Sequence, residues 1–511
     1  MRKGGDKEMN KQKITYALSI AAFLGSAALF PVFADNTQVA GNGAFSDTQV
    51  QTSDHSSTNV TQSNTAQVTN NVTVSNNTGN NTASFNTGGS TNIQTGDANA
   101  TVAVTNTAGS NTANVTGGTT GDQNTTVAGN GAFSENGVQT NSSTNTSVDQ
   151  ANTANFANNV KVANNTGNNS ADFNTGSNVG INTGNANAAV GIANTAGSNT
   201  AQVSGGTVGS QNTTIAGNGA FSDTNVSNKT HTSTSLTQTN NTNIANAVAV
   251  NNNTGKNSAD FNTGSNVGIN TGNANAWVGL SNTAGQNVAY VSGGSGNLNT
   301  YIDVLGNGAF SDNYVSARSS LKKVVTQSNL TYIANYIDTM NNTGNNTASF
   351  NTGSNVNIST GNANAGVTIF NTAGSNQAYV INPYYFANAA EIAVLGNGAF
   401  SDNTVNNAQD NKISVHQNNN TVFANYIRTS NNTGYNSEDF NTSSNKFLKS
   451  YLTFGGYTSY KNTGSHQNMF NYLNKYSYIG NYGHGTTAVR TGSSNANVGI
   501  YNLASANYLT Y

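Results

Sequence analysis

The sequence predicts an all-β protein, a tandem-repeat β-solenoid resembling a parallel β-helix, with a Tyr-rich C-terminal cap. Three observations predict this fold class. Near-copies of the phrase GNGAFS recur at steps of 88, 88, 89 and 90 residues, and a fixed period indicates units that bury apolar faces against their neighbours. Between glycine turns, apolar and polar residues alternate with the period of half-buried strands. The 511 residues include no cysteine and two prolines, so stability must come from continuous backbone pairing.

The first 34 residues are expected to be a secretory signal peptide. Lys11 and Lys13 give it a basic start, and an apolar stretch follows over residues 14–32. The segment that ends at Ala34 is typical of a signal-peptidase cleavage site, with the cut before Asp35. The alternative is an uncleaved membrane anchor. We therefore expect a secreted, extracellular protein of the cell surface that meets the membrane only through this peptide.

The remaining chain divides into five repeats, 35–122, 123–210, 211–299, 300–389 and 390–511, the last with a Tyr-rich insertion at 446–485. Two glycine turns recur in every repeat. The glycines that open the GNGAFS phrase are Gly41, Gly129, Gly217, Gly306 and Gly396. Those of an Asn-Thr-Gly turn are Gly79, Gly167, Gly255, Gly344 and Gly434. Because glycine tolerates positive φ, all ten are expected to be structural turns.

The strands between these turns are expected to bury small side chains. Ala98, Ala100, Val102 and Val104 fall on one strand face, and Phe85 is expected to point inward in the same way. Landmark glycines lie roughly 13 to 20 residues apart, which predicts a solenoid coil of about that length with one more turn near residue 60. Identical asparagines in stacked coils are expected to form hydrogen-bonded ladders, as in cross-β structures.

Two other folds fit parts of this pattern. Alternating strands with Asn-Gly turns would also suit antiparallel hairpins in a string of small β-domains. Low hydrophobicity with many asparagines, serines and threonines would suit disorder. A disordered chain has no need of a strict period, so the solenoid is preferred.

Catalytic and metal sites are not predicted, and neither is any cofactor. Charged residues are only 7% of the chain, and no basic stripe indicates nucleic-acid binding. An acidic residue follows each GNGAFS phrase, and a second recurs near the Asn-Thr-Gly turn at Asp172, Asp260 and Asp439. A calcium ladder would need several carboxylates per ion, so side-chain to backbone bonds at turns are the preferred explanation. Glycoside cleavage needs paired carboxylates at close range, and these acids follow the repeat instead. The protein is therefore expected not to be an enzyme.

The insertion at 446–485 concentrates tyrosine, phenylalanine and lysine. Tyrosine presents rigid amphipathic area and is enriched in recognition surfaces. One interpretation is therefore a binding or assembly tip, and the other is a cap over the open end of the solenoid. The candidate tip residues are Tyr451, Tyr457, Tyr460, Tyr472, Tyr476, Tyr478 and Tyr482.

The phrases NNTGNNTASFNTG and QSNTAQVTNNVTVSNNTG resemble the Asn/Thr/Gly-rich repeats of secreted surface proteins of bacteria, notably of candidate phyla. The phrases NTGNNTA and NTAGSNTA are faintly similar to curlin repeats, which build extracellular fibres. These resemblances imply a non-enzymatic structural or adhesive surface protein, a solenoid stalk presenting an aromatic C-terminal end. The alternative is a subunit of an extracellular filament or surface layer. The expected partners are the cell envelope, a surface glycan or protein, or further copies of the chain.

Overall fold

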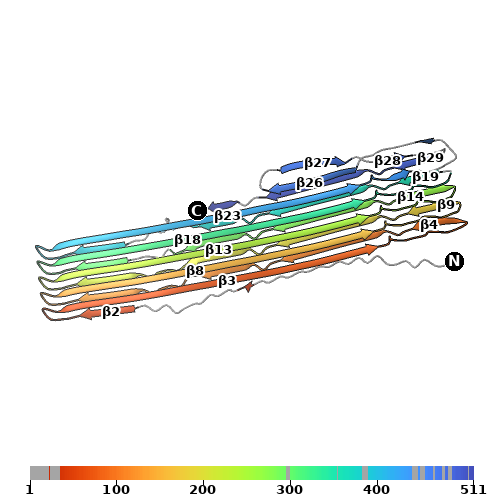
Figure 1. Cartoon of the computed structure of the whole chain (residues 1–511). Coiled ribbons are helices and arrows are strands. Elements are labelled where there is room, and N and C mark those ends of the chain that lie inside the picture. Colours follow the sequence, from red (N-terminus) through yellow and green to blue (C-terminus); the bar gives the residue numbers. More distant parts are fainter. Residues whose placement is uncertain are drawn as a thin grey trace.

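The structure is a computed structural model that describes residues 22–23, 35–294, 300–353, 355–381, 390–439, 447–448, 455–463, 467–474, 478–480, 486–503 and 506–510. These residues contain strands and no helix, stacked as parallel sheets (Figure 1). The predicted all-β solenoid is confirmed. The predicted signal peptide, 1–34, lies outside the described residues except for β1 (Ala22–Phe23), which pairs with β6 (Asn111–Thr116).

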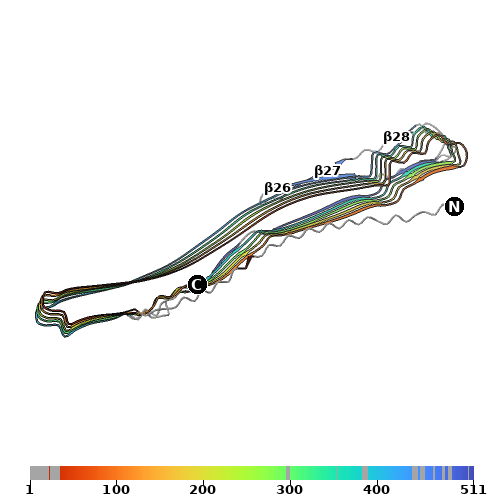
Figure 2. The same cartoon turned by 90° about the horizontal axis from the view of Figure 1, so that it is seen from below.

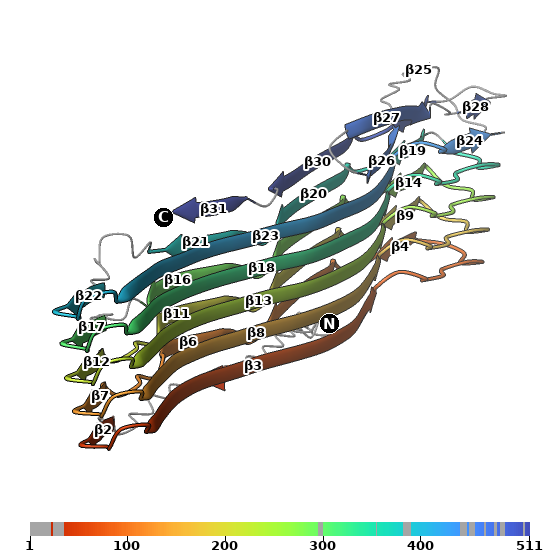
Figure 3. The same ribbon diagram turned by 90° about the vertical axis from the view of Figure 1, so that its left-hand side faces the viewer.

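One layer of the solenoid consists of unusually long strands that lie parallel in sequence order (Figure 3). Each has 31 residues: β3 (Asp47–Asn77), β8 (Glu135–Asn165), β13 (Asp223–Asn253), β18 (Asp312–Asn342) and β23 (Asp402–Asn432). At the end of this sheet the hairpin β26 (Gly455–Thr463) and β27 (Gln467–Asn474) is added in antiparallel fashion. These two strands form the insertion hairpin.

The facing layer is divided among three narrower parallel sheets. The first contains β2 (Asp35–Ala40), β7 (Gln123–Ala128), β12 (Gln211–Ala216), β17 (Thr300–Leu305) and β22 (Ala390–Leu395). The second contains β5 (Ala98–Thr107), β10 (Ala186–Thr195), β15 (Ala274–Thr283), β20 (Ala363–Thr372) and β30 (Ser494–Leu503). The third contains β1, β6, β11 (Asn199–Gly205), β16 (Asn287–Gly293), β21 (Asn376–Val380) and β31 (Asn507–Thr510).

A fourth narrow sheet closes the end of the solenoid opposite β2 (Figure 1). It contains β4 (Ser90–Gln94), β9 (Asn178–Asn182), β14 (Asn266–Asn270), β19 (Asn355–Ser359), β29 (Thr486–Arg490) and β25 (Phe447–Leu448). Beside it, β24 (Ser437–Asp439) pairs with β28 (Tyr478–Gly480).

One coil of the solenoid is a whole repeat, and the predicted coil of 13 to 20 residues is wrong. Val102 pairs with Val190, which pairs with Val278 and then Val367, so each step along the stack is one repeat. The expected turn near residue 60 lies within β3, which contains neither glycine nor proline to break it. Glycine spacing marks the corners of one large coil.

The solenoid is wide and short. A strand of 31 residues spans about 100 Å, whereas five strands stacked side by side rise only about 24 Å. The figures show the resulting flat, twisted plate, with the two layers seen edge-on in Figure 2. The expected stalk is therefore not the shape of a single chain, because the stacking direction is the short one.

The core lies between the two layers and repeats from coil to coil. Along β5 the burial alternates, so that Ala98, Ala100, Val102 and Val104 are buried as predicted. Phe85 is 76% exposed, and the prediction that it points inward is wrong. Its φ of 63° turns the backbone out of the strand conformation.

Pairing between coils is parallel throughout the described residues, so the alternative of separate antiparallel β-domains is wrong. Antiparallel pairing is described only where β23, β26 and β27 meet. The insertion lies inside the fifth coil and leaves its register intact. Asn341 and Asn431 are stacked 90 residues apart before it, and Asn371 and Asn502 are stacked 131 residues apart after it.

Candidate interaction surfaces

The two sets of turn glycines have different physical roles. The set that begins with Gly41 has positive φ, between 65° and 79°, as expected. The set that begins with Gly79 does not; there the positive φ falls on the following residue, for example Asn80. A Cβ on Gly79 would lie 2.0 Å from the Gly167 carbonyl oxygen, and Gly167, Gly255 and Gly344 repeat this distance. These glycines permit a close approach between coils.

Ladders of buried amide side chains run through the core along the stack. Asn70, Asn158, Asn246, Asn335 and Asn425 are linked by side-chain bonds of 2.7 to 2.8 Å. A second ladder starts at Asn106 in the facing layer and bonds to the first at 2.9 Å. Every amide of the first ladder except Asn425 therefore donates both along its own ladder and across the core, which satisfies polar groups that burial would otherwise leave costly. The predicted asparagine ladders are confirmed.

Two buried titratable groups interrupt otherwise regular columns. Lys323 occupies the position of Thr234 in the coil before it and donates from Nζ to the Ile381 carbonyl at 3.0 Å. Burial lowers the pKa of Lys323 to about 8. Glu438 lies beside Ser437, which is in register with Thr347. Burial raises the pKa of Glu438 to about 8, against a smaller opposing effect of the Ile358 backbone.

The repeated acids form columns on the coils. The residues after the GNGAFS phrases are stacked in register: Asp47, Glu135, Asp223, Asp312 and Asp402. Four of them line an open hollow of about 650 Å³. The second set bonds between coils, since Asp172 accepts from the Asp260 amide at 2.7 Å. Within the described residues no group of three His, Cys, Asp or Glu side chains is placed to hold a metal ion.

The predicted tip residues are not brought together by described side chains. Tyr451, Tyr476 and Tyr482 lie outside the described residues. The backbone register of the insertion hairpin places Tyr457 opposite Tyr472 and Tyr460 opposite Met469, while Tyr478 lies in β28. The tip assignment therefore stays a prediction.

Two ladders of exposed phenylalanine rings follow the turns at the ends of the long strands. Their rings are stacked 4.8 to 5.1 Å apart, and their φ values of 56° to 65° are unusual for a bulky residue. One comprises Phe45, Phe133, Phe221, Phe310 and Phe400, and the other Phe85, Phe173, Phe261 and Phe350. Phe45 and Phe400 are 79% and 80% exposed, against 47% for Phe221, because each terminal ring has one uncovered face.

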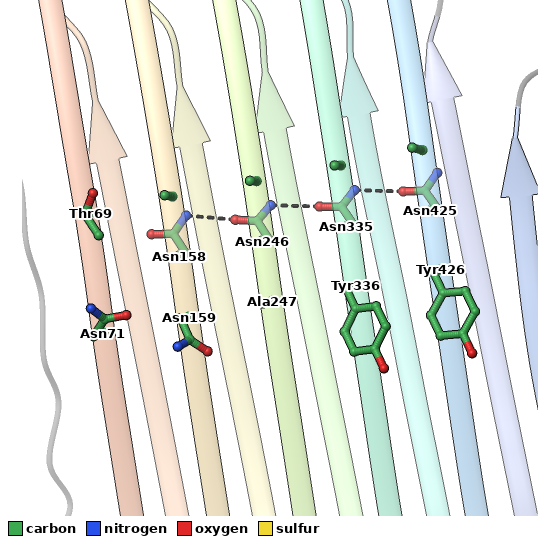
Figure 4. A pocket seen from close by; sticks show the side chains of 14 residues that line it. Thr69, Asn71, Asn158, Asn159, Asn246, Ala247, Asn335, Tyr336, Asn425 and Tyr426 are labelled. Carbon is green, nitrogen blue, oxygen red and sulfur yellow. Dashed lines mark hydrogen bonds between the residues drawn. The ribbon is translucent and has the colours of Figure 1, made fainter.

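An apolar groove of about 510 Å³ crosses the outer face of the long-strand sheet (Figure 4). Its floor is a row of alanines, one per coil from the second coil onward: Ala157, Ala245, Ala334 and Ala424. Two residues further along the strands, Tyr336 and Tyr426 stand beside the floor with their rings stacked 5.0 Å apart. Asn335 and Asn425 lie between floor and tyrosine in sequence, but their side chains point to the opposite face and bond along the core ladder.

The groove was missed by reasoning from the sequence. Tyr336 and Tyr426 lie at the same register position, so an alignment of the five repeats would place them in one column. The predicted binding residues were all tyrosines of the insertion, whereas Tyr336 and Tyr426 lie on regular coils.

Comparison with family models, with curated proteins and with solved structures returned no match. The resemblance to bacterial surface repeats therefore stays a prediction. Among the described residues there is no helix with the length and apolar character needed to cross a membrane.

Proposed function

We propose that the chain is a secreted, non-enzymatic structural protein of the cell surface that builds extracellular filaments by stacking copies coil on coil. The observation that carries this proposal is the open edge of the first coil. In the described residues β3 pairs only with β8, so one edge of a 31-residue strand offers its backbone groups. Long unpaired edges are templates for further pairing.

The two terminal coils present matching columns. If the fifth coil of one copy seats on the first coil of another, Gln417 meets Gln62 and Phe400 meets Phe45. The internal ladders already show these contacts, since Gln62 and Gln150 are bonded at 2.7 Å and Phe45 is stacked on Phe133. The junction would therefore repeat the interface between coils.

The insertion hairpin bears on this assembly. It covers β23 only from Ala424 to Ser430 and runs antiparallel to it. Residues 402–423 of β23 have no described neighbour on that edge. A complete parallel coil can seat there only after the hairpin has moved, so the hairpin is expected to slow assembly.

Electron microscopy of the purified chain over a range of concentrations tests the proposal. We expect filaments whose subunits repeat every 24 Å or so, the rise of five coils. The double variant Phe45→Asp/Phe400→Asp places like charges on both exposed ends and should suppress filaments. Tyr301→Asp is the control, because Tyr301 is exposed but lies in the fourth coil, with a coil stacked on either side. Dispersed single chains at every concentration would overturn the proposal.

A second candidate, adhesion, is favoured by aromatic residues on the other layer. Trp277, Tyr290, Phe370, Tyr379 and Tyr501 are exposed there and belong to the last three coils. Exposed aromatic residues are typical of recognition surfaces. Trp277 is the single tryptophan of the chain, so its fluorescence reports ligands on this face. An unchanged emission with intact cell envelopes would contradict adhesion through this layer.

A further inference from the structure

The outer face of the long-strand sheet carries an apolar patch confined to the last two coils. Its exposed members are Leu330, Tyr332, Tyr336, Met340, Val422 and Tyr426. At the register position of Tyr332 the first three coils hold Gln67, Asn155 and Asn243. The patch is thus a local departure from a polar repeat, and such a patch marks an interaction site.

We propose that this patch is the interface of a two-fold dimer, in which the Tyr336–Tyr426 ridge of each copy fills the alanine groove of the other. The ridge and the groove floor are two residues apart on the same strands. The two-fold axis of this dimer runs parallel to the stacking direction, midway between the tyrosine ridge and the alanine floor. Rotation of a second copy about this axis places the ridge of each copy over the groove of the other. The interface is then self-complementary, as two-fold symmetry requires.

The period of the ridge supports a second copy as the occupant. The residues of the ridge and those of the groove floor both repeat once per coil along the stack. The ring centroids of Tyr336 and Tyr426, for example, are 5.0 Å apart. A copy of the chain therefore has the same spacing as the groove by construction. Interdigitated side chains between facing sheets form a dry interface of the steric-zipper kind.

The same rotation brings suitable partners together beyond the groove. Met340 faces Leu330 of the other copy, which joins two exposed apolar side chains. Asp338 faces Tyr332 of the other copy. A phenol hydroxyl can donate to a carboxylate oxygen.

The size of the face is sufficient for a stable dimer. Five strands across the stack and the eleven residues from Leu330 to Met340 along it give roughly 800 Å² per copy. This is the usual contribution of one partner to a specific interface. The association uses the face of the plate, so it is independent of the proposed stacking of coils at the edges.

Analytical ultracentrifugation of the full chain at micromolar concentrations tests the dimer. The Phe45→Asp/Phe400→Asp background keeps filaments from obscuring the result. In that background Ala245→Arg, which puts a charge on the groove floor, should weaken dimerisation on the order of 100-fold. The matched control is Ser233→Arg, on the same strand, since its register partners Lys322 and Lys412 are already basic. It should leave the dimer unchanged.

Three outcomes overturn the proposal. The first is a chain that sediments as a monomer throughout, and the second is an Ala245→Arg variant that dimerises like its parent. The third is equal weakening by Ser233→Arg, which would indicate a general charge effect. Filament formation gives a separate readout. Without the background substitutions, Ala245→Arg should still form filaments, with half the mass per length.

Discussion

At the scale of single residues, the Asn-Thr-Gly glycines limit the distance between coils. We predict that Gly167→Ala lowers stability by about 3 kcal/mol, because its Cβ would lie 2.0 Å from the Gly255 carbonyl oxygen. Gly279→Ala is the control, since a Cβ there meets nothing within 4 Å. It should be neutral or slightly stabilising, because glycine weakens a strand interior. Thermal unfolding followed by circular dichroism measures both. Equal midpoints for the two variants would contradict this role.

Glu438 should make the stability of the last coil depend on pH. Its pKa is raised by burial to about 8 from an ordinary value of 4.5. Between these values the folded chain holds a proton that the unfolded chain has released, so the contribution of Glu438 to stability should fall as pH rises from 4.5 to 8 and change no further above that. Glu438→Ala should remove this slope, because the alanine matches Ala348 in the coil before it. Unfolding midpoints measured across that pH range provide the check.

At the scale of elements, the amide ladders should act as connected units. Asn246 bonds to Asn335, receives a bond from Asn158, and also donates to Asn282 across the core. We predict that Asn246→Leu costs about 2 to 4 kcal/mol, because buried amides on both sides lose partners. Asn243→Ala, on the exposed face of the same strand, should cost little. Chemical denaturation with both variants tests the difference, and similar midpoints would show that the ladder contributes nothing.

The insertion hairpin is expected to restrain assembly without supporting the coils. Deleting residues 445–485 restores the stacking offset of the fifth coil from 131 to 90 residues. We predict that this deletion keeps the thermal midpoint and accelerates filament growth, since β23 then has a fully open edge. Light scattering during polymerisation measures the rate. Slower growth by the deleted chain would favour the insertion as an assembly tip.

Much of this element structure was predictable, and its failures have physical reasons. Alternation correctly gave the buried face of Ala98 to Val104. The same pattern gave the wrong face for Phe85. A positive φ there reverses the direction of the side chain, and the alternation of apolar and polar residues does not reveal a positive φ. The predicted coil is too short because glycines occur at every corner within one coil, and the spacing between corners is shorter than the coil itself. The pairing partner of Val102 lies a full repeat away. Prediction of the groove requires the register between coils, and only a position-by-position comparison of the repeats reveals that register.

At the scale of the whole molecule, the coil of one repeat makes a direct prediction about deletions. Removing residues 123–210 takes out one coil and leaves Gln211 where Gln123 stood, since the two are register partners. We predict a folded solenoid with one coil fewer, because coils contact only their neighbours. Removing the shorter segment 151–170 should disrupt folding, since it cuts within β8 and the turn that follows. Circular dichroism and limited proteolysis distinguish the two. A folded product of the short deletion would contradict the long coil.

The position of the two described ends of the solenoid has a mechanical consequence. β2 belongs to the first coil and β31 to the last, so a pull on the two ends is directed along the stack. Such a load opens one edge at a time, and each coil peels away while those behind it keep their bonds. Each of the first four repeats would release roughly 300 Å of extended chain when it peels away. The protein should therefore yield under tension in a few long steps, the first four repeats giving steps of nearly equal length.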